Sequence, residues 1–186
     1  ERYRLNNIIN NLHDAVLAYD ENFKILVFNP AAEQIFGVEA SEVVGQKFTL
    51  KLKQEETPKF HTLVTILFPA LAPALIRHSD PGVYPQVIDI SFDDPFLELR
   101  VITHRLLEPN GEILGFVKII HDRTRELNLL KSKSEFITIA SHQLRTPITA
   151  LTWAMQSLEK EPLLKDQKEL ILNALNSLNH LTKIVN

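Results

Sequence analysis

The sequence predicts an α+β domain in its first two thirds and a pair of long α-helices in its last third. Three observations support this prediction. Residues 15–121 contain short runs of β-prone residues separated by turn-forming pairs such as Asn110-Gly111. No glycine follows Thr124 in the sequence. From that residue on, apolar side chains recur every three or four positions, which is the period of an α-helix with one apolar face.

The composition excludes several classes of protein. The chain has 186 residues, of which 45% are apolar and 23% charged, and a formal net charge of −3. This apolar fraction is sufficient for a buried core and excludes a disordered chain. The absence of cysteine excludes thiolate metal sites and cysteine nucleophiles. The acidic balance argues against nucleic-acid binding. The apolar stretch 63–76 is too short, and too interrupted by proline, to span a membrane.

The first part of the chain predicts one helix, two strands and two short helices. Residues 2–12 form a narrow amphipathic helix whose apolar stripe favours pairing with a second copy. Two strands follow, joined by a turn at Asp20-Glu21-Asn22, and Asn29-Pro30 ends the second. The short helices end at Gly37 and Gly45. The predicted ranges of the four later elements are 15–19, 23–28, 31–36 and 41–44.

The middle of the chain predicts a longer helical stretch and then three strands. Residues 57–77 are expected to be mostly helical, with interruptions at their prolines. After a turn at Asp80-Pro81-Gly82, three antiparallel strands are expected. In the second of them, Leu99 and Val101 alternate with Arg100, which is typical of a half-buried strand. The predicted strands are 83–92, 96–107 and 112–121.

The last third predicts two helices that need a partner. Thr124 or Asp122 is placed to cap the first helix, and Pro162 fits the start of the second. Each has one apolar stripe, so together they form half of a four-helix bundle that a homodimer completes. The first stripe contains Leu127, Leu130, Ser134, Ile137, Ser141, Leu144, Ile148, Leu151, Met155 and Leu158, and the second contains Leu164, Ile171, Ala174, Leu178, Leu181 and Val185.

The first of these helices contains the segment Ser141-His142-Gln143-Leu144-Arg145-Thr146-Pro147. Helix geometry places His142 one position past the stripe, with its imidazole in water and Thr146 one turn further on the same face. Pro147 has no N–H and crowds the carbonyl of Gln143, so we expect the helix to bend within one turn of the histidine. These residues alone leave open whether His142 is functional or only a polar residue on a solvated face.

Residues 133–151 closely resemble the phosphoacceptor region of sensor histidine kinases, which opens their dimerisation and histidine-phosphotransfer (HisKA) domain. The resemblance implies that His142 accepts the γ-phosphoryl group of ATP and passes it to an aspartate on a response-regulator receiver domain. A neutral imidazole suits this chemistry, because its free nitrogen attacks phosphorus in line and the resulting N–P bond remains reactive.

The same resemblance assigns roles to the neighbours of His142. The family usually has Glu or Asp directly after the histidine, whereas this sequence has Gln143. An amide accepts a hydrogen bond but takes no proton, so we expect slower or differently regulated autophosphorylation. Thr146 matches the residue that positions a water for dephosphorylating the regulator; its alternative role is a hydroxyl bonded back to a helix carbonyl. Arg145 and Pro147 belong to the same motif.

The first two thirds of the chain resemble a PAS sensor domain. The resemblance rests on Phe28-Asn29-Pro30-Ala31-Ala32-Glu33 with Phe36-Gly37, on Val44-Gly45, and on the segment 115–124. It implies a five-stranded antiparallel sheet with helices on one face around a small cavity. Asp122 and Thr124 resemble the family's junction residues, which tie the last strand to the signalling helix.

Together the two resemblances divide the chain into four parts. These are an N-terminal signalling helix (1–12), a PAS domain (13–123), a coiled-coil linker (124–133) and a HisKA domain (134–186) that is truncated in its second helix. The predicted fold class is therefore an α+β PAS domain followed by an all-α helical hairpin that forms a dimeric four-helix bundle. We expect a fragment of a longer protein.

The cofactor predictions are mostly negative. A haem needs an inward-facing histidine, and the candidates His61 and His78 lie in polar surroundings or at a helix end, so no haem is expected. Without cysteine no flavin adduct is expected, and the histidine spacing predicts no metal site. The PAS cavity is left open between a packed core and a small organic ligand. ATP and Mg²⁺ are expected only in the parent protein, through an ATP-binding domain that follows.

The predicted function is the sensor and phosphoacceptor part of a cytoplasmic two-component histidine kinase, inactive by itself. Its expected partners are a second copy, a receiver domain and the ATP-binding domain of the parent. One alternative is a PAS and coiled-coil signalling module without kinase competence, favoured only by Gln143; a second is a purely structural dimerisation protein. The signal, the anchoring of the parent and the choice between cis and trans phosphorylation are left open.

Overall fold

The computed structural model describes residues 2–49, 60–162 and 164–185, and the chain divides into two compact units, Glu1–Leu127 and Asn128–Asn186. The first unit begins with helix α1 (Arg2–Asn10) and contains the sheet; the second contains most of a helical hairpin. Among the described residues, no helix has both the length and the apolar character needed to cross a membrane.

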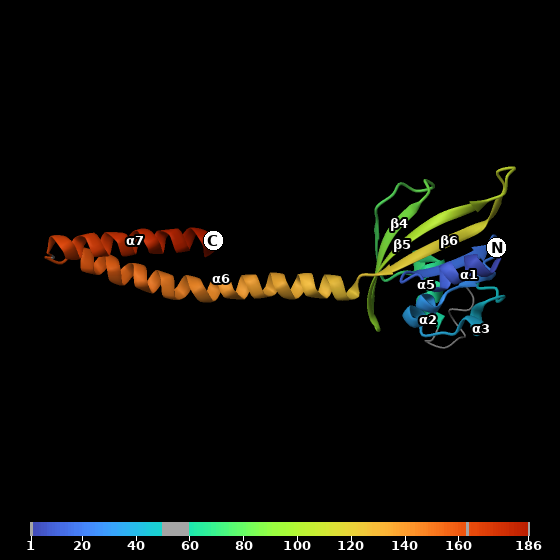
Figure 1. Ribbon diagram of the computed structural model, residues 1–186, viewed down its shortest axis with the longest axis horizontal. Coiled ribbons are helices and arrows are strands. Elements are labelled where there is room, and N and C mark those ends of the chain that lie inside the picture. Colours follow the sequence, from blue (N-terminus) through green and yellow to red (C-terminus); the bar gives the residue numbers. More distant parts are fainter. Residues whose placement is uncertain (1, 50–59, 163, 186) are drawn as a thin grey trace. The chain divides into compact units, whose positions relative to one another are not determined.

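The first unit is built on one antiparallel sheet of six strands in the order β2-β1-β6-β5-β4-β3. Figure 1 shows β4, β5 and β6 side by side in this sheet. The last strand in sequence, β6, lies near the middle of the sheet and pairs with both β1 and β5. The strands are β1 (Ala15–Asp20), β2 (Ile25–Phe28), β3 (Ala74–Arg77), β4 (Gln86–Asp93), β5 (Phe96–Leu107) and β6 (Ile113–Asp122).

Among the residues that the structure describes, three short helices cover one face of this sheet: α2 (Pro30–Phe36), α3 (Ala40–Val43) and α5 (His61–Leu67). Every second residue of the strands points toward them, as the two-residue period of a strand requires. The core contains fully buried side chains from both layers, among them Leu17, Ile90 and Ile120 from the sheet and Leu63 and Ile66 from α5. The predicted α+β architecture with helices on one face is confirmed.

The sixth strand corrects the sequence prediction, which had five. Residues 57–77 were expected to be mostly helical, but α5 ends at Leu67, a 3-10 turn η2 covers Pro69–Leu71, and Ala74–Arg77 is β3. The prolines remove the N–H groups that a continuing helix needs, and the open edge of β4 pairs with the extended chain after Pro73. Residues 57–59 of the predicted helix lie outside the described residues.

The other predicted elements of this unit are present: the strand predicted at 96–107 has the predicted bounds, and the others differ by a few residues at one or both ends. The strand expected at 83–92 begins at Gln86, because the segment before it passes through turns. The turn at Asn110-Gly111 is confirmed: the N–H of Gly111 donates to the Glu108 carbonyl at 2.9 Å. Gly111 has φ +88°, a conformation that other residues rarely adopt.

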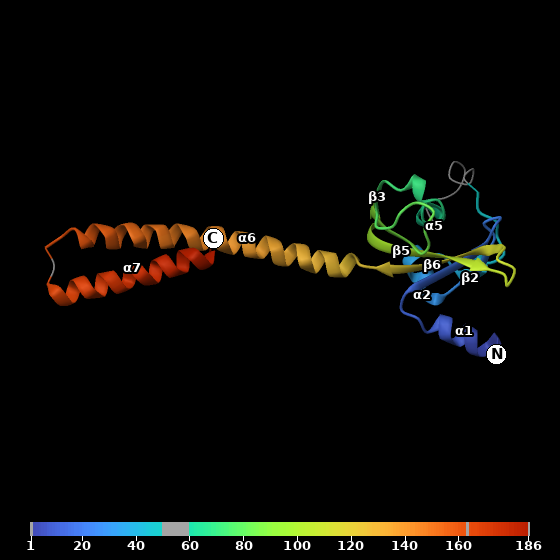
Figure 2. The same ribbon diagram turned by 90° about the horizontal axis from the view of Figure 1, so that it is seen from above.

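The second unit is an α-helical hairpin (Figure 2). Helix α6 (Thr124–Glu159) runs unbroken through Pro147, and α7 (Lys165–Val185) follows, starting later than Pro162, where the sequence predicted it. Ile148 of α6 and Leu178 of α7 are each only 9% exposed. Other members of the predicted stripes remain open to solvent in the single chain, including Ile137 at 54% and Leu151 at 51%.

Asn29 holds the start of the first unit together. Its side chain is fully buried and caps α2 by accepting a hydrogen bond from the Ala32 N–H at 3.0 Å. The same oxygen accepts from the Val16 N–H at 2.8 Å, while the amide nitrogen donates to the carbonyls of Ile9 and Asp14. One amide therefore connects the N-terminal segment, β1 and α2.

Replacing Asn29 by alanine is expected to lower the free energy of unfolding of the full chain by about 2–4 kcal/mol, because a helix cap is lost and buried backbone groups lose their partners. Urea unfolding followed by circular dichroism measures this change. Asn22→Ala is the matched control, since Asn22 is exposed in a turn, and it is expected to change stability by less than about 0.5 kcal/mol. Equal effects of the two substitutions would contradict this account.

Candidate functional site

His142 lies near the middle of α6 with an exposed side chain. Its neighbours Gln143, Arg145, Thr146 and Pro147 are exposed as well. Across the described part of the chain, no hydrogen bond or ion pair involves the imidazole of His142 or the amide of Gln143. The ring is therefore accessible to a reaction partner, as the helix geometry predicted.

The hydroxyl of Thr146 differs from those of nearby threonines. Thr138, Thr149 and Thr152 each donate to the carbonyl four residues before them, at 2.8–3.0 Å. Within the described residues no such bond is found for Thr146, an exposed residue one turn after His142. A hydroxyl that is not bonded to its own helix is available to a water molecule or a reacting group.

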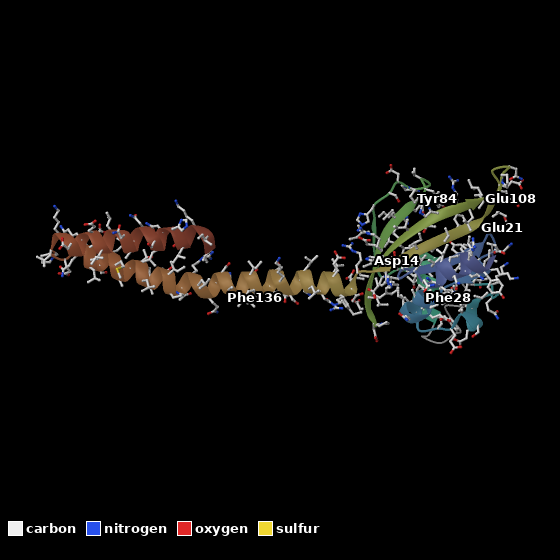
Figure 3. The ribbon with its side chains drawn as sticks, in the orientation of Figure 1. Asp14, Glu21, Phe28, Tyr84, Glu108 and Phe136 are labelled. Carbon is white, nitrogen blue, oxygen red and sulfur yellow. The ribbon has the colours of Figure 1, made fainter. Side chains whose placement is uncertain are left out.

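Exposed apolar side chains lie on α6 both before and after His142 in the sequence. Leu144 is 51% exposed, and Phe136, labelled in Figure 3, is 71% exposed. About one turn after His142, residues of α6 and of the end of α7 line a small cleft. They are Arg145, Ile148 and Thr149 of α6 and Thr182 and Val185 of α7. An apolar surface of this kind on an isolated hairpin indicates that the helices pack against a further partner.

The junction between the sheet and α6 is held by hydrogen bonds to Glu98 of β5. Only Arg123 separates β6 from α6, and its N–H donates to the Glu98 carbonyl at 2.8 Å. The N–H of Glu98 in turn donates to the Thr124 hydroxyl at 2.9 Å. Asp122 accepts from the N–H of Thr124 at 2.9 Å, so both predicted junction residues lie in this contact.

Asp89 of β4 adds a charged contact that the sequence prediction missed. Its carboxylate accepts two hydrogen bonds from Arg100 on the neighbouring strand, at 2.8 and 2.9 Å, and lies 2.8 Å from Nε2 of His78. Nη1 of Arg123 approaches the same carboxylate at 3.5 Å. The hydrogen bonds from Arg100, with a smaller effect from His78, lower the pKa of Asp89 to about 2. One feature of the sequence could have predicted part of this contact. Asp89 and Arg100 have opposite charges and face each other across the paired strands β4 and β5.

The two candidate haem ligands, His61 and His78, are both exposed to solvent. His61 is exposed at the start of α5, with its ring edge-on to Phe92 at 6.5 Å between centroids. His78 is exposed and bonded to Asp89. Over residues 2–49, 60–162 and 164–185, no three His, Asp or Glu side chains gather in a way that could hold a metal ion.

Comparison with protein families matches both parts of the chain. Residues 3–123 match the family described as the PAS fold, and residues 132–186 match the His Kinase A (phospho-acceptor) domain. His142 and its motif lie inside the second match, and the junction at 122–124 lies at the end of the first.

Curated relatives that match most of the chain are named as sensor or signal-transduction proteins. Drug sensory protein A of Synechocystis sp. is 27% identical over 199 residues, which cover 100% of this chain and 30% of that protein. The signal transduction histidine-protein kinase AtoS of Escherichia coli is 27% identical over 188 residues, covering 92% of this chain and 28% of AtoS. The sensor protein kinase WalK of Staphylococcus aureus is 22% identical over 160 residues, covering 86% and 24%.

The chain thus spans about a quarter to a third of the length of these relatives. Two of these relatives are named as kinases, which does not favour a signalling module without kinase competence. The fold of the first unit, the exposed histidine of α6 and the two family matches agree with one another. The chain therefore belongs to the PAS family and continues into a HisKA phosphoacceptor domain, in the domain order of a sensor histidine kinase.

Proposed function

We propose that His142 is the phosphoacceptor of a two-component sensor kinase whose ATP-binding domain lies outside this chain. The observation that supports this most directly is the exposed, unpartnered imidazole of His142 inside the match to the HisKA domain. In the proposed reaction the unprotonated ring nitrogen attacks the γ-phosphorus of ATP. An N–P bond forms, the bond to the bridging oxygen breaks, and ADP leaves.

The phosphoryl group is then passed to an aspartate of a receiver domain. The carboxylate attacks phosphorus, the N–P bond breaks and the imidazole is regenerated. The ATP-binding domain would supply nucleotide and Mg²⁺, so the present chain alone does not phosphorylate itself. A protein that exchanges phosphate with ATP and a receiver domain works in the cytoplasm.

The neighbours of His142 have distinct proposed roles. Gln143 orients the imidazole as a hydrogen-bond acceptor but takes no proton. The exposed hydroxyl of Thr146 positions a water for dephosphorylation of the receiver aspartate. Arg145 lies on the surface that a docking domain would contact, and Pro147 lets α6 bend close to His142.

The proposed assembly is a homodimer in which two hairpins form a four-helix bundle. The exposed stripe residues of α6 and α7 support this, because a second hairpin would cover them. In this proposal residues 1–12 are a signalling helix, 13–123 the sensor, 124–133 the linker and 134–186 the phosphoacceptor domain. The contacts of Asp122 and Thr124 would transmit a change in the sheet to the linker.

The phosphoacceptor role is tested by label transfer from γ-labelled ATP to the intact parent protein. His142→Gln is expected to abolish acid-labile, base-stable label, because the amide offers no nucleophilic ring nitrogen. His180→Gln is the matched control, since His180 is an exposed histidine of α7, and it is expected to retain the label. Label that persists in the His142 variant would refute the assignment.

Replacing Gln143 by glutamate is expected to raise the autophosphorylation rate of the parent by about tenfold or more, because a carboxylate accepts the ring proton as positive charge develops. The initial rate of label incorporation measures this effect. Gln156→Glu adds the same charge at another exposed position of α6 and is expected to leave the rate unchanged. An unchanged rate in the Gln143 variant would contradict the proposed role of this position.

Replacing Asp89 by asparagine is expected to lower the stability of the first unit by about 1–3 kcal/mol, since charge-assisted hydrogen bonds are lost. The amides of Arg123 and Thr124 should then exchange hydrogen faster. The lowered pKa means that this contribution is complete above about pH 4 and is lost as the pH falls toward 2. Asp93→Asn, at an exposed position of the same strand, is the control. Equal protection of the Arg123 and Thr124 amides from hydrogen exchange in both variants would contradict the role of the Asp89 contact.

A further inference from the structure

Lys118 of β6 is a lysine in the core of the sensor unit. Only 4% of the surface of this residue is accessible to solvent. The strand alternation places it on the same face as Ile120, which is fully buried in the main core cluster. The ammonium group therefore lies on the helix-covered face of the sheet, where charged side chains are rare.

The sheet register gives the neighbours of Lys118. Leu17 of β1 and Thr103 of β5 lie directly opposite it, and Gln86 of β4 lies opposite Thr103. Residues paired in this way share a face. Nζ of Lys118 donates to the Thr103 hydroxyl at 3.0 Å, and the same nitrogen lies 6.0 Å from the centre of the Tyr19 ring.

No carboxylate balances this charge among the residues that the structure describes. Burial lowers the pKa of Lys118 to about 8, so the group is still mainly protonated at neutral pH. The ammonium has three donors, and a hydroxyl and an aromatic face are weak compensation for lost hydration. Methionine would fill the same space without this penalty, so packing alone does not account for the lysine.

Aromatic rings lie beside the ammonium on the same face. The rings of Tyr19 and Phe116 are stacked, with centroids 5.6 Å apart, and Tyr84 approaches Phe116 at 6.0 Å. Tyr84 belongs to the segment just before β4 and is labelled in Figure 3. Flat apolar surfaces next to one buried cation and one hydroxyl group suit a planar molecule with a single negative charge.

We propose that the inner face of the sheet at Lys118 binds a small aromatic monocarboxylate. Its carboxylate accepts hydrogen bonds from the ammonium of Lys118 and the hydroxyl of Thr103, and its ring lies against Tyr19 and Phe116. The single charge of the ligand balances the single buried charge of the protein. Binding does not require phosphorylation, so this proposal and the role of His142 can fail independently.

The test is a calorimetric titration of the full 186-residue chain with benzoate and with benzamide, which has the same shape but no charge. Wild-type protein is expected to bind benzoate about tenfold or more tightly than benzamide. Lys118→Met should abolish this preference while remaining folded, with a thermal midpoint equal to or above that of the wild type. Lys24→Met, at an exposed position, is the control and should retain the preference.

Two results would overturn the proposal. One is the absence of benzoate binding to the wild type at concentrations up to about 10 mM. The other is a preference for benzoate over benzamide that survives in the Lys118 variant, because the carboxylate would then be bound elsewhere. In the supporting case, the NMR signal of the Lys118 side chain titrates at higher pH once benzoate is bound.

Discussion

A single residue, Arg123, separates the sheet from the long helix that carries His142. Because β6 is paired on both sides, by β1 and by β5, two hydrogen-bond ladders fix its position. The hydrogen bonds between Glu98 and the first residues of the junction leave little freedom to the first turn of α6. The direction and rotation of the first turn of α6 therefore follow from the register of β6.

Charged residues lie on both faces of the sheet near β6. On the inner face, Lys118 lies four residues before the end of β6, in a core that offers its ammonium little compensation. On the outer face, Asp89 brings together Arg100, His78 and Arg123. An anion that pairs with Lys118 would change the forces on β6 close to the point where β6 becomes helix. The proposed ligand site and the junction with α6 thus lie on the same strand.

Much of this arrangement could be predicted from local sequence, and the exceptions have physical reasons. Asn110-Gly111 and the alternation of 96–107 determine their elements through short-range preferences, and Pro30 and Gly37 delimit α2 in the same way. Ala74–Arg77 has no strand-like alternation; it is extended because the edge of β4 pairs with it, which is a long-range effect. The exposure of His142 follows from helix geometry alone. The contact of Asp89 with Arg123 joins residues distant in sequence, so only the sheet order reveals it.

The proposed transmission of a change in the sheet to His142 is tested most directly by insertions into α6 after Lys131, in the parent protein. Seven inserted residues restore the helix phase to within about 20°, whereas two rotate the following segment by about 200°. The labelling of His142 from γ-labelled ATP is the readout. The account predicts that the seven-residue insertion retains the wild-type level and that the two-residue insertion changes it strongly. Equal labelling of both variants would contradict the proposed transmission through the phase of α6.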